Sequence, residues 1–343
     1  MASSSSNSKI QLLTLFAFCL GFTVVVMGAY VRLSDAGISC PDWPTCYGHI
    51  GVPKSTLQID QAHENFPGAE KVEGHKAWKE MIHRYMAGGL GLLVFFISFY
   101  IVKRRKQFPG LAKLAVFLSM LIIFQAALGA FTVTIKLMPI IVTSHLMFGF
   151  AMLVSLWVMY FKLKRLVVSD EVIQGNGFSK LVMAGIIVLL LQIFLGGWTT
   201  SNYAQGICPD FPTCQNKQWL PAHDFKHAFE IHTDTSINYQ GGILNRAARV
   251  TIHMLHRAGA VVTLLLLLII GLIAIVRKGY CGLRSTGLAM LIVLVMQLTL
   301  GVSNVILQIP VSVAAAHNGI GALLLLMMVT LYLRSRRASI SAR

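Results

Sequence analysis

Eight long apolar stretches constrain the fold of this 343-residue chain more than any other feature of its sequence. Each is long enough to cross a bilayer, because a helix needs about 20 apolar residues to span the hydrocarbon core. Charged residues make up only 12% of the chain, too few to cover a water-soluble globule of this size. The sequence therefore predicts an all-α membrane protein. We expect its spans at residues 10–33, 81–102, 111–135, 139–161, 179–200, 251–276, 284–307 and 311–333.

Basic residues cluster directly after every second span, at 103–106, 162–165, 277–278 and 334–337. Cytoplasmic connections of membrane proteins are enriched in Lys and Arg, so we expect these connections and both termini in the cytoplasm. Most of the 29 basic residues but only two of the 13 acidic residues fall on that side. The net charge of +16 therefore indicates orientation and attraction to anionic lipid rather than binding to nucleic acid.

The second half of the chain repeats the first. GAYVRLSDAGISCPDWPTC at 28–46 recurs as GGWTTSNYAQGICPDFPTC at 196–214, MIHR at 81–84 as MLHR at 254–257, and QAALG at 125–129 as QLTLG at 297–301. Each half holds four spans, and an even number returns the chain to its starting side of the membrane. We therefore expect two tandem four-helix bundles, residues 1–165 and 166–343, related by a pseudo-twofold axis along the membrane normal.

Four histidines occupy matching positions in the two halves. His83 and His256 are expected to open the second and sixth spans, and His145 and His317 lie just inside the fourth and eighth. Two imidazoles that face each other across a bundle can supply both axial ligands to a haem iron. Hydrogen-bonded helix packing is the alternative for any one of them. Four ionisable residues in duplicate at a costly depth favour haem.

Charged residues flank these histidines. Arg84 and Arg257 each directly follow one of them, where a guanidinium can pair with a haem propionate or contact lipid phosphate. Glu80 stands three residues before His83 and so shares its helical face, whereas His253 takes the equivalent place in the second half. A carboxylate beside one site only favours proton chemistry in the first half. Stabilisation of a first-turn Glu by the helix dipole is the alternative.

Two pairs of cysteines share the pattern C-P-D-[WF]-P-T-C. On an oxidising outer face we predict the disulfides Cys40–Cys46 and Cys208–Cys214. Closing so short a loop stabilises the fold by only about 2 kcal/mol. A redox or cofactor-transfer role for the first pair therefore stays open. A zinc site that uses His49 lacks a complete ligand set.

The chain resembles the heme A synthases, bacterial and mitochondrial enzymes of cytochrome oxidase assembly. The resemblance rests on eight spans in two halves, the outer-loop Cys pairs, E-x-x-H-R at 80–84, H-R at 256–257 and single histidines at 145 and 317. It implies oxidation of the C8 methyl group of haem O to a formyl group, which makes haem A for a terminal oxidase. It also implies the plasma membrane of a bacterium as location and a haem O synthase (protohaem farnesyltransferase) as a candidate partner.

The same resemblance assigns roles to particular residues. It implies that His256 and His317 hold a haem b and that His83 and His145 bind the substrate haem. It further implies that Glu80 is essential for catalysis and that the first Cys pair contributes to catalysis or haem transfer.

Two other functions fit parts of the pattern. A dihaem b-type electron carrier needs the four histidines but has no special use for Glu80, and retention of haem A by the purified protein separates the two readings. A transporter agrees with the duplicated halves. Transporters commonly place carboxylates at mid-span, however, whereas the acidic residues here lie almost entirely in the outer connections.

Overall fold

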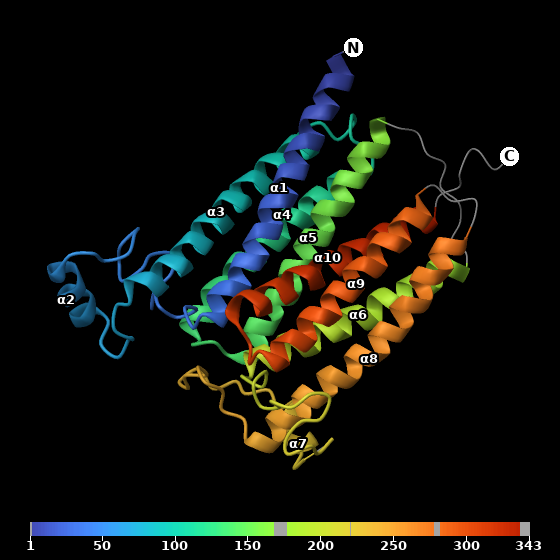
Figure 1. Ribbon diagram of the computed structural model, residues 1–343. Coiled ribbons are helices and arrows are strands. Elements are labelled where there is room, and N and C mark those ends of the chain that lie inside the picture. The colour runs from blue at the N-terminus through green and yellow to red at the C-terminus, as the bar shows by residue number, and fades with distance from the viewer. Residues whose placement is uncertain (1, 168–176, 220, 278–281, 337–343) are drawn as a thin grey trace. The chain divides into compact units, whose positions relative to one another are not determined.

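The computed structural model describes residues 2–167, 177–219, 221–277 and 282–336. Lys278 and Arg337 of the basic clusters therefore lie outside the described residues. Eight helices are long and apolar enough to cross a membrane, and the described residues contain no strand, which confirms an all-helical membrane protein with eight spans. The long helices in Figure 1 are α1 (Ala2–Leu33), α3 (Gly74–Lys103), α4 (Ala112–Thr134), α5 (Pro139–Val167), α6 (Gly177–Ser201), α8 (Arg246–Val276), α9 (Leu283–Ile306) and α10 (Val311–Ser335). Two short helices, α2 (Thr56–Asn65) and α7 (Phe225–Ala228), lie in the connections.

Three long helices begin at least one turn before the spans that the sequence predicts, the first being α1, which begins at Ala2. Helix α3 begins at Gly74 and α8 at Arg246, each at least one turn before its apolar stretch. Asn245 caps α8, and its side chain accepts a hydrogen bond from a backbone N–H of the first turn. The added turns are polar, so apolarity alone could not reveal them. His83 and His256 consequently lie well inside their helices and do not open them.

Close contacts divide the chain into two compact units, each with four of the long helices. Unit 1 comprises Met1–Leu163 and Ile231–Ile243, and unit 2 comprises Lys164–Glu230 and Leu244–Arg343. The short piece 231–243 belongs to unit 1 although it follows α6 in the chain. It is held there by Tyr239, whose side chain is fully buried and whose N–H donates to the main-chain oxygen of Lys136 at 3.0 Å.

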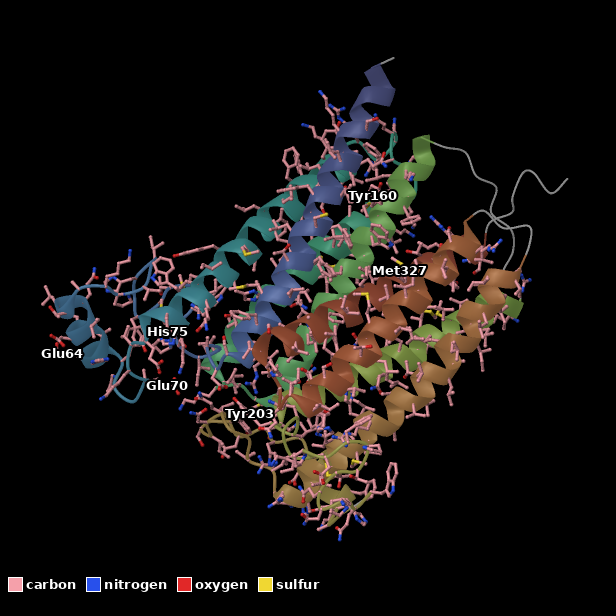
Figure 2. All side chains as sticks on the ribbon, in the orientation of Figure 1. Glu64, Glu70, His75, Tyr160, Tyr203 and Met327 are labelled. Carbon is pink, nitrogen blue, oxygen red and sulfur yellow. A yellow bond between two sulfur atoms is a disulfide. The ribbon has the colours of Figure 1, made fainter. Side chains whose placement is uncertain are left out.

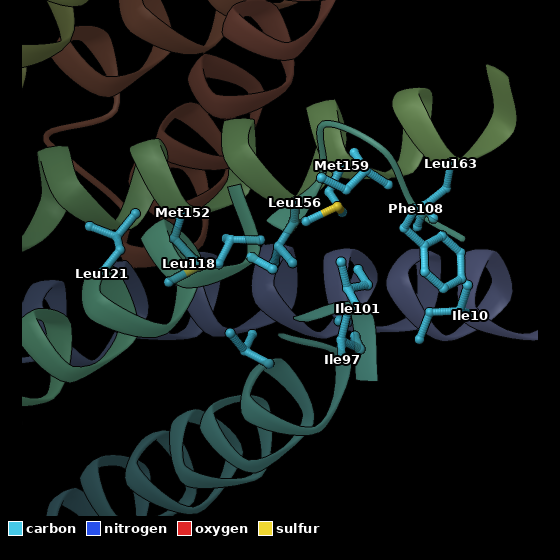
Figure 3. Close-up of a cluster of buried hydrophobic side chains, with 14 of the residues drawn as sticks. Ile10, Ile97, Ile101, Phe108, Leu118, Leu121, Met152, Leu156, Met159 and Leu163 are labelled. Carbon is cyan, nitrogen blue, oxygen red and sulfur yellow. The ribbon is translucent and has the colours of Figure 1, made fainter. Parts of the chain in front are cut away.

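The core of unit 1 is one apolar cluster to which α1, α3, α4 and α5 all contribute, as Figure 3 shows. In α3 the buried positions recur every three or four residues, at Leu90, Val94, Ile97 and Ile101. This spacing places them on one face of a helix. The connection between α3 and α4 closes the cluster with Phe108, whose ring is fully buried. The four long helices of unit 1 therefore pack around one apolar cluster, and a second cluster lies beneath the first disulfide loop.

Unit 2 brings helices α8 and α9 close together at small residues. A Cβ atom added at Gly287 of α9 would lie 2.8 Å from Cβ of Ala274 and 3.1 Å from the main-chain oxygen of Gly271, both in α8. Small residues at such positions let two membrane helices approach until their backbones touch. The α8–α9 contact therefore has no room for a side chain at Gly287.

Equivalent helices of the two units end in the same way. After α4 the chain passes through two residues of positive φ, Lys136 and Leu137, and after α9 it does so at Gln308 and Ile309. In each pair the N–H of the second residue donates to a carbonyl near the helix end, at 2.9 and 2.8 Å. Positive φ is uncommon for residues with a side chain. The shared local conformation therefore shows that the repeat extends to backbone geometry.

We predict that Gly287→Ala lowers the thermal stability of the protein, because its methyl group would push α8 and α9 apart. Overpacking of this kind costs about 1–3 kcal/mol. Gly149→Ala is the matched control, since its Cβ atom would meet only Cγ2 of Val25 at 3.8 Å, an ordinary contact. Melting temperatures measured by circular dichroism in detergent should fall for the first variant only. Equal values for both would contradict the close contact.

Candidate functional site

The four histidines form two pairs, one in each unit. His83 of α3 pairs with His145 of α5 in unit 1, and His256 of α8 pairs with His317 of α10 in unit 2. Within each pair the two histidines come from different long helices of the same unit. The structure therefore brings together, from two helices of each unit, the residues that the sequence proposes as partners.

A glycine of a neighbouring helix faces each imidazole. A Cβ atom added at any of these glycines would lie only 2.9 to 3.4 Å from Cε1 of the ring. The contacts join Gly28 to His83, Gly129 to His145, Gly196 to His256 and Gly301 to His317. All four glycines belong to the repeated motifs at the ends of α1, α4, α6 and α9. These repeated glycines are therefore required for packing, because only a residue without a side chain leaves space for the ring.

Three of the four rings bury a nitrogen that has no protein partner. The Nδ1 atoms of His83, His145 and His317 are buried and make no hydrogen bond among the described residues. Buried polar atoms are normally paired, so each such atom needs an explanation. Two imidazoles per unit are also the axial donor set of an iron porphyrin, which itself supplies the other four ligands. The residues present therefore fit a haem in each unit.

Arg84 connects the first disulfide loop to the helix that carries His83. Its guanidinium donates to the main-chain oxygens of Asp42 at 2.7 Å and Thr45 at 2.6 Å, and more weakly to that of Cys40 at 3.4 Å. The same group forms an ion pair with Glu80, one turn earlier in α3. One side chain therefore fixes the loop, the carboxylate and the helix together.

Arg257 makes the same connection in unit 2. It donates to the main-chain oxygens of Asp210 at 2.9 Å, Thr213 at 2.6 Å and Cys208 at 2.9 Å. These carbonyls occupy places in the second loop equivalent to those bound by Arg84 in the first. Both arginines thus direct donors to the outer loops, partners that sequence reasoning did not foresee. Their pairing with haem propionates stays a prediction.

The two loops have a common internal construction. Both expected disulfides are formed, Cys40–Cys46 and Cys208–Cys214. The aspartate that follows Cys-Pro accepts backbone N–H groups from later in the loop. Asp42 accepts from Tyr47 at 2.6 Å and from Gly48 at 2.9 Å, and Asp210 accepts from Lys217 at 3.2 Å. The repeated C-P-D thus encodes a turn as well as a crosslink.

Tyr47 packs in the interior of the first disulfide loop. Its side chain is buried, packs edge-on against Phe66 and donates its hydroxyl hydrogen to the main-chain oxygen of Glu70 at 2.7 Å. Burial, reinforced by the carboxylates of Glu70, Glu80 and Asp42, raises the pKa of Tyr47 to about 12. The phenol therefore stays neutral at physiological pH and keeps this hydrogen bond.

Glu80 makes unit 1 chemically different from unit 2. Its side chain is buried, with Oε2 accepting the N–H of Cys40 at 3.0 Å while the other oxygen pairs with Arg84. Because α3 begins earlier than expected, Glu80 lies beyond the first turn, and the helix-dipole explanation does not apply. In unit 2 the equivalent residue is His253, whose Nδ1 lies 2.8 Å from the main-chain oxygen of Ala204. The structure thus joins the Glu80 carboxylate to the first disulfide loop.

Sequence reasoning missed Gln192 of α6. Its Nε2 lies 3.0 Å from Nδ1 and 2.9 Å from the main-chain oxygen of His256. The repeated glutamines Gln125 and Gln297 instead contact the second histidine of their units, at 3.2 and 3.3 Å. Gln192 has no counterpart in the repeat. Its only signal in the sequence is a polar side chain within an apolar span.

Other polar residues of the outer connections lie away from the histidine pairs. In Figure 2, Glu64 lies in α2, Glu70 lies in the connection that follows it, and His75 lies in the first turn of α3. His75 is exposed and lies 3.7 Å from the carboxylate of Glu73. His75 is therefore a surface residue.

The fold and the site define a multi-pass, all-helical membrane protein with two histidines and a disulfide loop in each unit. Residues 11–329 match the COX15-CtaA family, described as cytochrome oxidase assembly proteins. The heme A synthase of Shewanella oneidensis is 43% identical over 326 residues, which cover 94% of this chain and 96% of that protein.

Two further relatives are also heme A synthases. That of Nitrosospira multiformis is 29% identical over 91% of this chain and 89% of its own length, and that of Shouchella clausii is 28% identical over 72% and 70%. The chain belongs to the COX15-CtaA family. This membership confirms the resemblance to heme A synthases inferred from the sequence, and with it an oxidoreductase of haem A biosynthesis.

We predict that Arg84→Met makes the Cys40–Cys46 disulfide easier to reduce, because the loop loses its charged hydrogen-bond donor. Hydrogen bonds to charged groups contribute about 1.5–3 kcal/mol each, so reduction should be at least about tenfold faster. Arg257→Met is the matched control and should affect only Cys208–Cys214. Mass spectrometry of alkylated peptides during titration with a phosphine reductant measures both bonds. Unchanged rates in both variants would show that the arginines do not hold the loops.

Proposed function

We propose that this protein oxidises the C8 methyl group of haem O to a formyl group, through an alcohol, and so produces haem A. Membership in a family of cytochrome oxidase assembly proteins supports this reaction, as does similarity to a heme A synthase along 94% of the chain. The converted haem is more electron-withdrawing, which suits it to a terminal oxidase.

Within this activity we assign haem O to unit 1, between His83 and His145, and a resident haem b to unit 2, between His256 and His317. The observation that carries the assignment is the buried carboxylate of Glu80 on the His83 helix. Oxidation of a methyl group releases protons, and a carboxylate is the group best suited to accept them. Unit 2 has no carboxylate at this place and fits a haem that is not chemically altered.

The residues around Glu80 determine how it acts. The N–H of Cys40 and the guanidinium of Arg84 both point at its oxygens, so the carboxylate is held in one orientation beside the substrate pair. The first disulfide loop, with Tyr47 buried inside it, shields Glu80 from bulk solvent. When bound, haem b would supply an iron that exchanges single electrons. Arg257 retains a buried Nε with no partner among the described residues, a donor available to a haem propionate.

We also propose that the halves 1–165 and 166–343 are tandem bundles of equal orientation, with both termini in the cytoplasm of a bacterial cell. The matching helix ends, arginine–loop contacts and glycine–histidine contacts support the tandem arrangement. The basic connections support the orientation, and disulfides in both loops agree with an oxidising outer face. A haem O synthase is the proposed source of substrate, because so apolar a haem passes poorly through water.

Removing an axial ligand should distinguish the two haem sites, because the two pairs of variants should give different results. We expect His256→Ala and His317→Ala to lose the tightly held b-type absorption spectrum. We expect His83→Ala and His145→Ala to retain that spectrum but to form no haem A. Absorption spectra of the purified variants, with chromatography of extracted haems, measure both outcomes. A b-type spectrum that survives loss of His256 would refute the assignment of haem b to unit 2.

Glu80→Gln should keep haem bound but suppress haem A formation, by about 100-fold to 10,000-fold, which is the usual contribution of general acid–base catalysis. The amide of glutamine preserves the size of the side chain, but it cannot take up a proton or form an ion pair with Arg84. Glu64→Gln on the exposed helix α2 is the control and should leave haem A formation unchanged. Normal haem A formation in the first variant would remove the proton-transfer role from Glu80.

A further inference from the structure

Among the four ligand histidines, His256 alone has its Nδ1 atom hydrogen-bonded to a side chain in the described part of the chain. Nε2 of Gln192 reaches both that nitrogen and the main-chain oxygen of the same residue, at 3.0 and 2.9 Å. The Nδ1 atoms of His83, His145 and His317 are buried without a partner. The ring of His256 is therefore held at Nδ1 by a side chain, whereas the ring of His317 is contacted only at Nε2, by Gln297 at 3.3 Å.

The sequence around Gln192 is adapted to this contact. Gly259, three residues after His256, lies against the amide so closely that a Cβ atom there would collide with Oε1 of Gln192. In unit 1 the repeat places Val24 at the position of Gln192 and Met86 at the position of Gly259. Neither of these side chains can donate or accept a strong hydrogen bond. The glutamine and the glycine that makes room for it thus occur together, and only in unit 2.

The amide of Gln192 can form a hydrogen bond to the ring of His256 whether or not that ring binds iron. A histidine that binds iron through one nitrogen carries hydrogen on the other, and an acceptor for that hydrogen fixes the ring and makes it a stronger ligand. In the structure the Nε2 end of the amide faces Nδ1, which suits a ring without iron. The Oε1 end is buried and has no partner among the described residues. Half a turn of the amide would present Oε1 to the Nδ1–H group of an iron-bound ring.

We propose that Gln192 is the positioning residue that makes His256 a permanent haem ligand, and that its absence from unit 1 lets the haem at His83 exchange. The proposal rests on the function proposed above, which requires one retained haem and one that arrives as substrate and leaves as product. Retention in unit 2 and exchange in unit 1 then follow from the hydrogen bond at Nδ1 of His256, which has no equivalent at Nδ1 of His83.

The test replaces Gln192 by Val, the residue that unit 1 carries, in the full-length protein loaded with haem b. A metal-bound histidine that loses the hydrogen-bond partner of its other ring nitrogen binds the metal about 10- to 100-fold more weakly. We therefore expect release of haem b to apomyoglobin to accelerate by that factor. The midpoint potential should rise, because His256 becomes a poorer electron donor to iron. Gln192→Glu keeps an acceptor, so it should retain haem and shift the potential downward.

Gln125→Val is the matched control, because Gln125 contacts only the main-chain oxygen of His145. It should leave the release rate and potential of haem b unchanged. Unchanged release and potential in Gln192→Val would overturn the proposal. If that variant does not accumulate, an unshifted potential in Gln192→Glu would overturn it instead. Failure of the proposed function is recognised separately, by a b-type spectrum that persists in His256→Ala.

Discussion

The structure depends on placing four imidazole rings inside apolar helices. An ionisable side chain at membrane depth is costly unless neighbouring groups accommodate it. Here the accommodation starts with the backbone, since each ring lies against a glycine of the adjacent helix and occupies the space that a side chain would fill. Substitution of any of these glycines would displace a ring. The four glycine–histidine contacts therefore determine how α1, α4, α6 and α9 approach their partners, and with this the geometry of both sites.

Hydrogen bonds connect the two disulfide loops to these sites. Each disulfide loop turns its main-chain oxygens toward an arginine that directly follows one of the four histidines. In each unit the guanidinium therefore links the disulfide loop to the helix. In unit 1 the same guanidinium also holds Glu80, whose other oxygen accepts the N–H of Cys40. This connection gives a physical basis for a contribution of the first Cys pair to catalysis, because its loop orients the carboxylate.

Duplication supplied two similar sites, and a few substitutions made them different. Glu80 in unit 1 corresponds to His253 in unit 2, so only unit 1 has a carboxylate at this position. Val24 in unit 1 corresponds to Gln192 in unit 2, which adds a hydrogen bond to one ligand only. The backbone turns, disulfides and glycine contacts are meanwhile shared. Both differences lie within one or two helical turns of a repeated motif, where they alter chemistry without altering the fold.

The sequence by itself determined the eight spans, the four histidines, both Cys pairs and the exceptional Glu80, because length, apolarity and repetition can be read from residue types alone. It missed the polar first turns of α3 and α8, since apolarity does not detect a helix that extends beyond the membrane. Only the tertiary structure decided where Arg84 and Arg257 direct their donors, which backbone N–H group Glu80 accepts, and that Gln192 meets His256. Most of these partners are main-chain atoms, which every residue possesses, so no pattern of side chains could identify them before the chain was folded.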